Sequence, residues 1–375
     1  MNPRRSHRKS RLGCSECKKR HIKCDESRPS CLNCSRTERQ CSFAGLTANI
    51  PVASPAPSST SSQVRSDVEP DPIDVPPANM VQMDLMFHLF SSGGMGLAPV
   101  LPLTHTISPE QLVQQALGCD YLMNELLAFA ARHLAIIKPD QRAFYLHQAS
   151  CLQTHALSLF TRAQVKPSRD NCLQVAFFSW VLGNHLLSDL PTDDDHVDIL
   201  SGFLHYLKVY RGLRVVVMGA WRFLLESEHR ALFRQGETTA ENLGTGAHTS
   251  KLISLVQDSL GLDDAEKAGC SEAIARIQWA FNIKDDMDPK TATEHYFTIA
   301  FSWPQLVSPE YLACVQKKRP EALLVLAHFA VVLSWCRNHW IFGSVGARLL
   351  ESIMSALGPG WETWLQWPRE NVQIG

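Results

Sequence analysis

Six cysteines between residues 14 and 41 repeat one spacing twice, and this repeat constrains the fold more than any other feature of the chain. Each copy is a Cys-x2-Cys pair followed, after six further residues, by a third cysteine. A two-residue gap lets both thiolates of one turn reach the same Zn2+ at about 2.3 Å. The six-residue gap holds a short helix that brings the third thiolate back. The expected metal ligands are Cys14, Cys17, Cys24, Cys31, Cys34 and Cys41.

The number of sulfurs indicates how many metals they hold. Two separate four-thiolate zinc sites need eight thiolates, and this segment has six. Six thiolates suffice if two of the cysteines each bind both metals. Three disulfides, or a single zinc with two spectator cysteines, are the alternatives. The Arg-rich N-terminus lacks the apolar core of a secretory signal, so we expect a reducing compartment, which disfavours disulfides. The twofold repeat favours two Zn2+ per chain over one.

Charge divides the chain into two contrasting parts. Residues 1–44 hold twelve Lys/Arg against four Asp/Glu, a net charge of +8, whereas the other 331 residues carry −9. A basic head on an acidic body predicts a polyanion-binding module. Lys and Arg that neutralise phosphates give sequence-independent affinity, and Arg or Lys paired to guanine is the commonest base contact. We therefore expect double-stranded DNA as the partner, contacted through Lys18, Lys19, Arg20, His21 and Lys23.

The head resembles the fungal Zn2Cys6 binuclear cluster of transcription factors. Besides the cysteines, the resemblance is carried by Gly13, residues 18–23, Cys24-Asp25-Glu26, Arg28-Pro29-Ser30-Cys31 and Asn33-Cys34. It implies a nuclear, sequence-specific regulator of transcription that is not an enzyme.

The same resemblance implies roles for individual residues. Cys14 and Cys31 would bridge the two metals, and Pro29 would lie in the loop between the halves. The first short helix would enter the major groove over a CGG triplet. By position, Arg20 and His21 match the residues that touch bases, although His21 stands where the family often has Lys. The lysines Lys18, Lys19 and Lys23 would mostly contact phosphates.

The rest of the chain predicts a linker and a helical body. Residues 45–80 hold seven prolines, a Ser/Thr run and no aromatic residue, which is typical of disorder. Beyond them, apolar residues at 3–4 spacing indicate helices, with a break expected at Trp303-Pro304. No apolar run reaches the 18 residues of a transmembrane helix. The expected fold is mostly α: a zinc-cluster domain (1–44), a disordered linker (45–80) and an all-α regulatory domain (81–375). A helix start is expected at Ser108-Pro109-Glu110, and 3–4 spacing runs from Leu122 to Ile137. Similar helical patterns run through 140–164, 170–188, 198–228, 263–284, 308–318, 320–340 and 344–357.

The body resembles the regulatory domains of fungal factors of the sterol uptake control type. The resemblance implies control of a sterol-related or secondary-metabolite gene set, and a lipophilic ligand or a protein partner at the body. No heptad pattern is sustained over three repeats, so the oligomeric state stays open. The residues that carry the resemblance are Phe301-Ser302-Trp303-Pro304, Arg319-Pro320-Glu321, Leu326-Ala327-His328-Phe329, Gly360-Trp361 and Trp364-Leu365, with Lys208 to Arg214.

Two alternatives stay open: one is an enzyme with a helical body fused to a zinc module, and the other is a different kind of binding protein. Residues 194–198 fit the acidic DDxxD pattern of helical terpenoid-type enzymes, with a looser cluster at 285–288. Acids are favoured in a first helical turn in any case, so we interpret the first run as a helix start. The second alternative is a cofactor that uses its zinc cluster only for protein contacts. We expect His328 to be a buried, hydrogen-bonded side chain, and Cys119, Cys151, Cys172, Cys270, Cys314 and Cys336 to be small buried hydrophobes.

Overall fold

The chain forms two units, Met1–Val75 and Pro76–Gly375, here called the first unit and the body. The computed structural model describes residues 13–27, 30–37, 39–42, 78–91, 109–190, 198–230, 233, 241–286 and 289–373. Most of the predicted linker, Pro29 and the acidic residues 194–197 lie outside the described residues. The two units are therefore described separately.

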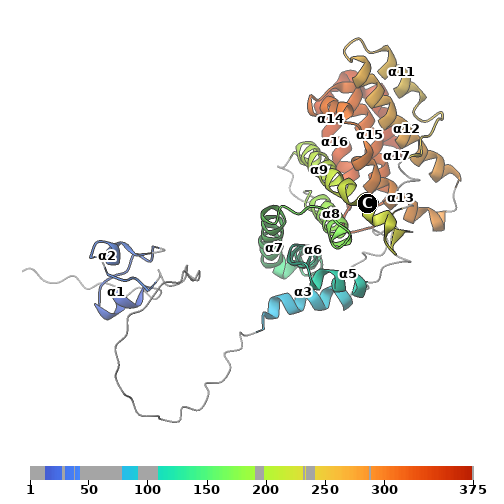
Figure 1. Cartoon of the computed structure of the whole chain (residues 1–375). Helices are drawn as coiled ribbons and strands as arrows, with labels where there is room; N and C mark the ends of the chain where they lie inside the picture. The colour runs from blue at the N-terminus through green and yellow to red at the C-terminus, as the bar shows by residue number, and fades with distance from the viewer. Residues whose placement is uncertain are drawn as a thin grey trace, which may run out of the picture. The chain divides into compact units, whose positions relative to one another are not determined.

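The first unit is built around its cysteines. It contains two short helices, α1 (Ser15–Lys19) and α2 (Leu32–Ser35), which contact each other (Figure 1). The buried side chains of its core, among the residues described, are the six cysteines alone. So small an apolar core cannot hold a fold without a cross-link or a metal.

The described residues of the body form helices joined by turns and loops, and no strand occurs among them. None of its described helices is both long and apolar enough to cross a membrane. Its helices are α3 (Met80–Ser91), α5 (Pro109–Leu117), α6 (Asp120–Ile137), α7 (Arg142–Arg162), α8 (Cys172–Ser188), α9 (Ile199–Glu226), α11 (Ser250–Asp258), α12 (Asp264–Asp286), α13 (Pro289–Leu306), α14 (Pro309–Gln316), α15 (Pro320–Trp335), α16 (Val345–Leu357) and α17 (Glu362–Asn371).

Helix α15 lies at the centre of the C-terminal part of the body. Every residue from Ala322 to Trp335 is buried, as expected for a helix that is apolar all round. It contacts α11, α12, α13, α14, α16 and α17, and Figure 1 shows these orange and red helices gathered around it. Pro320 begins α15 and Pro309 begins α14, positions where the missing proline N–H costs no helical hydrogen bond.

The predicted break at Trp303-Pro304 is wrong. Helix α13 continues through Pro304 and ends at Leu306. Trp303 is buried, donates its Nε1–H to the Ala273 carbonyl at 3.0 Å and stacks on Phe329 with ring centroids 4.0 Å apart. These contacts hold the last turn of α13 in place, although proline removes one of its backbone donors.

Several other features differ from the sequence predictions. The sequence patterns did not predict α11, α13 or α17, and α17 has Pro368 inside it. Helix α3 buries Leu85 and Leu89 while Met83 and Phe87 on its other side are exposed. Five of the six scattered cysteines are buried as expected, but Cys151 is exposed.

Candidate metal centre and nucleic-acid interface

The six cysteines of the first unit form two groups of four. One group is Cys14, Cys17, Cys24 and Cys31, and the other is Cys14, Cys31, Cys34 and Cys41. Within each group the sulfur atoms all lie within 4.8 Å of one another. Cys14 and Cys31 belong to both groups. Each group is therefore a complete set of four ligands, and six sulfurs fill the eight ligand positions of two metals.

The distances between sulfurs fit tetrahedral zinc. Four sulfurs at about 2.3 Å from one Zn2+ lie about 3.8 Å from each other. The Cys14 and Cys31 sulfurs are 3.7 Å apart, Cys14 and Cys34 are 3.7 Å apart, and Cys17 and Cys31 are 3.6 Å apart. All six cysteines are free of disulfides. The described residues thus supply the donor set of two Zn2+, which confirms the expected cofactor.

Burial of the cysteines favours a metal that can stabilise them as thiolates. The six side chains are almost fully buried. Desolvation raises the pKa of the Cys17 thiol, and that of Cys34 to about 12, so these two thiols would keep their protons without a metal. Zn2+ supplies the positive charge that holds such groups as thiolates, which couples metal binding to folding. Two Zn2+ and six thiolates carry a net charge of −2, which nearby Lys and Arg offset.

The two halves of the cluster cap each other's helices. Residues 13–27 form the first half and residues 30–42 the second, and equivalent positions differ by 17 in number. Asp25, which follows Cys24, accepts a hydrogen bond from the first amide of α2, that of Leu32, at 3.1 Å. Ser42, its equivalent after Cys41, accepts one from the first amide of α1, that of Ser15, at 2.9 Å. A helix N-terminus has orphan N–H donors, and each half supplies an acceptor for the other.

Helix α1 ends in the middle of the basic run (residues 18–23). The His21 amide donates to the Lys18 carbonyl at 3.2 Å and the Ile22 amide to the Cys17 carbonyl at 3.1 Å. This hydrogen-bond pair is the Schellman motif, which needs a left-handed residue at its turn. His21 supplies that residue with φ 53°. The Schellman turn therefore fixes the direction in which residues 21–23 of the basic run leave helix α1.

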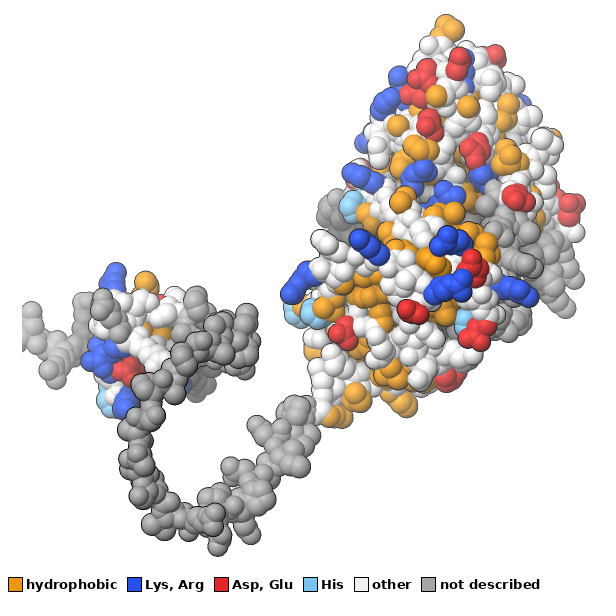
Figure 2. Space-filling model, in the orientation of Figure 1, with side chains coloured by type: hydrophobic (Ala, Val, Ile, Leu, Met, Phe, Trp, Pro, Cys, Tyr) orange, Lys and Arg blue, Asp and Glu red, His pale blue; other side chains and the backbone are white. Residues whose placement is uncertain are grey.

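The basic run lies on the surface and is fastened to the second half. Lys18, Lys19, His21 and Lys23 are exposed, and Arg20 is half-buried. Arg20 Nη1 donates to Thr37 Oγ1 at 3.3 Å, and Asn33 Nδ2 donates to the Lys23 carbonyl at 2.8 Å. The structure thus brings all five predicted DNA contacts together at the end of α1, and Figure 2 shows lysine and arginine side chains on this unit.

The second half carries much less charge at the equivalent positions. Residues 18–23 hold four Lys/Arg and no acid, whereas residues 35–40 hold two Arg and one Glu. Arg39 donates to Glu16 of the first half at 3.2 Å. Although the two halves share a backbone arrangement, the positive charge is concentrated on the first.

The acidic residues of the body take structural positions where they are described. Asp198 is the N-cap of α9 and accepts the Leu200 amide at 3.1 Å. Its hydrogen bond from Ser201 lowers the carboxyl pKa. Asp285 lies on α12 and contacts His248 Nε2 at 2.8 Å. Of the acidic run at residues 194–198, only Asp198 is described, and it begins a helix as we interpreted.

Two further features of the body bear on ligand binding. His328 is buried and its Nδ1 is 2.8 Å from the Leu324 carbonyl, so it is the hydrogen-bonded core histidine that was expected.

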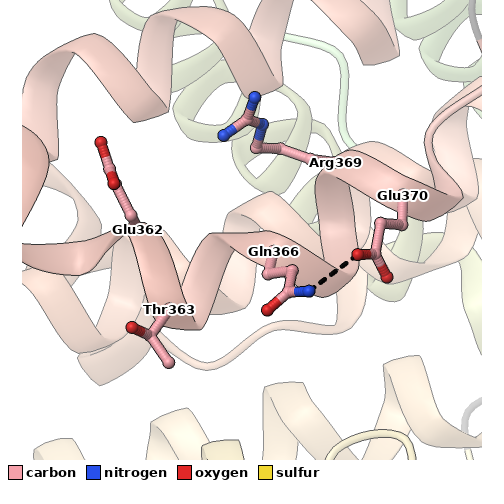
Figure 3. Close-up of a pocket in the computed structure, with 5 residues that line it drawn as sticks. All are labelled: Glu362, Thr363, Gln366, Arg369 and Glu370. Carbon is pink, nitrogen blue, oxygen red and sulfur yellow. Dashed lines mark hydrogen bonds between the residues drawn. The ribbon is translucent and has the colours of Figure 1, made fainter.

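A surface pocket of about 550 Å³ lies along α17 (Figure 3). Its wall is polar and includes a hydrogen bond from Gln366 to Glu370 at 2.9 Å, a lining that does not suit a sterol. The pocket residues are Glu362, Thr363, Gln366, Arg369 and Glu370.

Sequence reasoning missed the side chains that support the basic run. Asn33, Thr37, Asp25 and Ser42 all contact the other half of the cluster. The 17-residue offset between the repeats shows that Asp25 is equivalent to Ser42 and Arg20 to Thr37, but it does not show which residues these side chains contact.

Comparisons with known proteins agree with this site. Residues 12–48 match the fungal Zn(2)-Cys(6) binuclear cluster domain. A "Zn(2)-C6 fungal-type transcription factor" of Gibberella zeae is 26% identical over 98% of this chain and 86% of its own length. The "Zn(2)-C6 fungal-type transcription factor afumD" of Aspergillus fumigatus is 26% identical over 88% of this chain and 86% of its own length.

Other relatives match only a short stretch. "Sterol uptake control protein 2" of Candida albicans is 55% identical over 40 residues, which is 11% of this chain and 6% of that protein. The relatives similar over most of the chain are named as transcription factors, in agreement with a protein that is not an enzyme. Residues 12–48 therefore form a fungal Zn(2)-Cys(6) binuclear cluster domain, and over most of its length the chain is similar to Zn(2)-C6 fungal-type transcription factors.

Proposed function

We propose that the protein regulates transcription by binding CGG-type DNA elements through the end of helix α1. The observation that carries this proposal is the exposed basic run, held in one direction beside a pair of four-thiolate groups. Arg20 and His21 would contact base edges in the major groove. Lys18, Lys19 and Lys23 would contact phosphates, which fixes the register but carries no sequence information.

A gel-shift experiment tests the proposal. Full-length, zinc-loaded protein is titrated against a duplex that contains CGG and against a duplex of the same composition with that triplet scrambled. We expect tighter binding to the CGG duplex, and loss of binding after chelation of zinc. Equal binding to both duplexes would contradict the CGG assignment, and no binding to either would favour a cluster used for protein contacts.

The body, in this proposal, controls the first unit and does not touch DNA. Residues 76–375 hold 23 Lys/Arg against 29 Asp/Glu, a net charge of −6, which disfavours contact with phosphates. Large apolar side chains such as Trp303, Tyr311 and Phe329 are buried in its core, and the pocket of Figure 3 is polar. This pocket does not suit a lipophilic ligand, so we propose a protein partner for the body. The sterol-related or secondary-metabolite gene set is what the resemblance implies.

We propose that the protein acts in the nucleus. Five basic residues precede the cluster, at positions 4, 5, 8, 9 and 11, in addition to the basic run. Such clusters serve nuclear import as well as DNA binding. A fluorescent fusion of the full chain should concentrate in the nucleus, and replacing those five residues by Ala should weaken that accumulation. A fusion that stays in the cytosol would contradict the assignment.

A further inference from the structure

A continuous hydrogen-bond path joins the second half of the cluster to both ends of the segment 20–23. Arg20 Nη1 donates to Thr37 Oγ1 at 3.3 Å, and Thr37 Oγ1 donates to the Asn33 carbonyl at 2.7 Å. The Asn33 side chain then donates to the Lys23 carbonyl at 2.8 Å. Helix α2 and the turn that follows it thus hold the segment of the first half that would face DNA.

Thr37 occupies the position equivalent to Arg20 in the repeat. Its backbone amide donates to the Cys34 carbonyl, as expected at the end of α2. The threonine offers no charge to DNA, and its side chain contacts no cysteine sulfur in the described hydrogen bonds. Its hydroxyl accepts from Arg20 while it donates to a carbonyl, so both its hydrogen-bonding roles are used inside the cluster.

The contact leaves the arginine free to read a base. A guanidinium has five N–H donors, and the bond to Thr37 uses one on Nη1. The edge formed by Nε and Nη2 keeps the paired donors that match guanine O6 and N7. An arginine side chain gives up about 2 kcal/mol of rotamer entropy when it is fixed. A side chain already held by Thr37 would lose less of that entropy on binding.

We infer that Thr37 is a positioning residue for base recognition: it holds Arg20 so that the free edge of the guanidinium is presented to guanine. The inference rests on the proposed function, because it requires Arg20 to contact a base. It assigns a role in sequence discrimination to a half of the cluster that has no lysine. Asn33 supports the same segment from its other end.

The test compares Thr37→Val with Thr37→Ser in the full, zinc-loaded chain. Valine keeps the shape of the threonine side chain and removes its hydroxyl, whereas serine keeps the hydroxyl. We expect Thr37→Val to reduce the ratio of affinities for CGG and scrambled duplex about 3- to 10-fold, the value of one ordinary hydrogen bond. Thr37→Ser should keep the ratio of the unmodified protein. The salt dependence should not change, because no phosphate contact is removed.

Two controls separate positioning from general damage. Ser35→Ala removes a hydroxyl at the end of α2, two residues before Thr37, that bonds only Ser30 within the described contacts, and it should leave the ratio unchanged. In an Arg20→Ala background, Thr37→Val should have no further effect, because Thr37 acts through Arg20. A zinc content of two per chain verifies the fold of each variant. If Thr37→Val loses zinc, Thr37→Ala takes its place in the comparison.

The outcomes distinguish this inference from the proposed function. If Thr37→Val weakens CGG and scrambled duplex equally, or acts as strongly without Arg20, Thr37 is structural and the inference is wrong while CGG recognition stands. If the unmodified protein does not discriminate the two duplexes, the proposed function fails and the inference fails with it.

Discussion

The sulfur atoms of Cys14 and Cys31 lie 3.7 Å apart, and each belongs to both four-sulfur groups of the cluster. This shared edge is the structural reason why six cysteines suffice for two metals. It also makes the six ligands unequal, since loss of a shared sulfur affects both metals and loss of any other affects one.

The first prediction follows from that inequality. Cys14→Ala or Cys31→Ala should lower zinc content below that of Cys24→Ala, because both metals lose a ligand. Native mass spectrometry of the full chain should count two Zn2+ in the unmodified protein. A count of one zinc with intact disulfides, or equal losses in all three variants, would contradict the shared-ligand arrangement.

The second prediction concerns the backbone of His21. Its φ of 53° is a conformation that suits glycine best. His21→Gly should therefore keep two Zn2+ and remove only the side chain, whereas His21→Val should also strain the Schellman turn and lower zinc affinity. Binding to a set of duplexes with altered triplets then reports whether the imidazole contributes to base preference. Equal zinc affinity of the two variants would argue against the left-handed turn.

The third prediction tests the packing of α16 on α15. A Cβ added at Gly346 would lie 2.6 Å from the Ala330 carbonyl oxygen and 2.7 Å from the Ser334 nitrogen, both backbone atoms of α15. Gly346→Ala should lower the free energy of unfolding by about 1–3 kcal/mol. Gly212→Ala is the matched control, because nothing lies within 4 Å of its added Cβ, and it should stabilise α9 by up to about 1 kcal/mol. Chemical denaturation followed by Trp fluorescence reports the body, which holds all nine Trp.

The fourth prediction is a pH dependence of the body. Burial lowers the pKa of His328 to about 4, from about 6.5 in an unfolded chain. As pH falls below 6.5 the unfolded chain binds a proton that the folded protein does not, so stability falls. Between pH 7 and pH 5 this histidine should remove about 2 kcal/mol from the free energy of unfolding.

The variant His328→Phe isolates that contribution. Its ring can still stack on Trp367, which lies nearly parallel to the His328 ring with centroids 5.2 Å apart. The variant should lose less stability than the unmodified protein between pH 7 and pH 5. His133, whose pKa burial also lowers to about 4, contributes with the same sign in both proteins. Identical pH profiles would show that His328 is not the group responsible.

The sequence predicts the zinc centre well because the chemistry is local. Ligand spacing within a turn depends on few residues, so Cys14-x2-Cys17 and its repeat identify the metal without knowledge of the fold. The mostly helical body is also predicted, since burial of one helix face leaves a period in the sequence. The prediction fails where the outcome depends on distant partners: Pro304 stays in a helix because Trp303 bonds the backbone of α12.

The support of the basic run could not be predicted for the same reason. Arg20 and Lys23 are visible as charges in sequence, but their partners Thr37 and Asn33 lie in the other half of the cluster. Only the folded arrangement, in which α1 and α2 face each other around the cysteines, brings them within hydrogen-bond distance.

The measurement that tests the account most directly is the salt-dependent binding of CGG and scrambled duplexes by the full chain and by two variants. Arg20→Ala should cost about 1–3 kcal/mol on the CGG duplex and little on the scrambled one. Lys23→Ala should weaken both duplexes alike and lower the salt slope by about one. If the two substitutions have the same effect on discrimination and on salt slope, the division of the basic run into base and phosphate contacts is wrong.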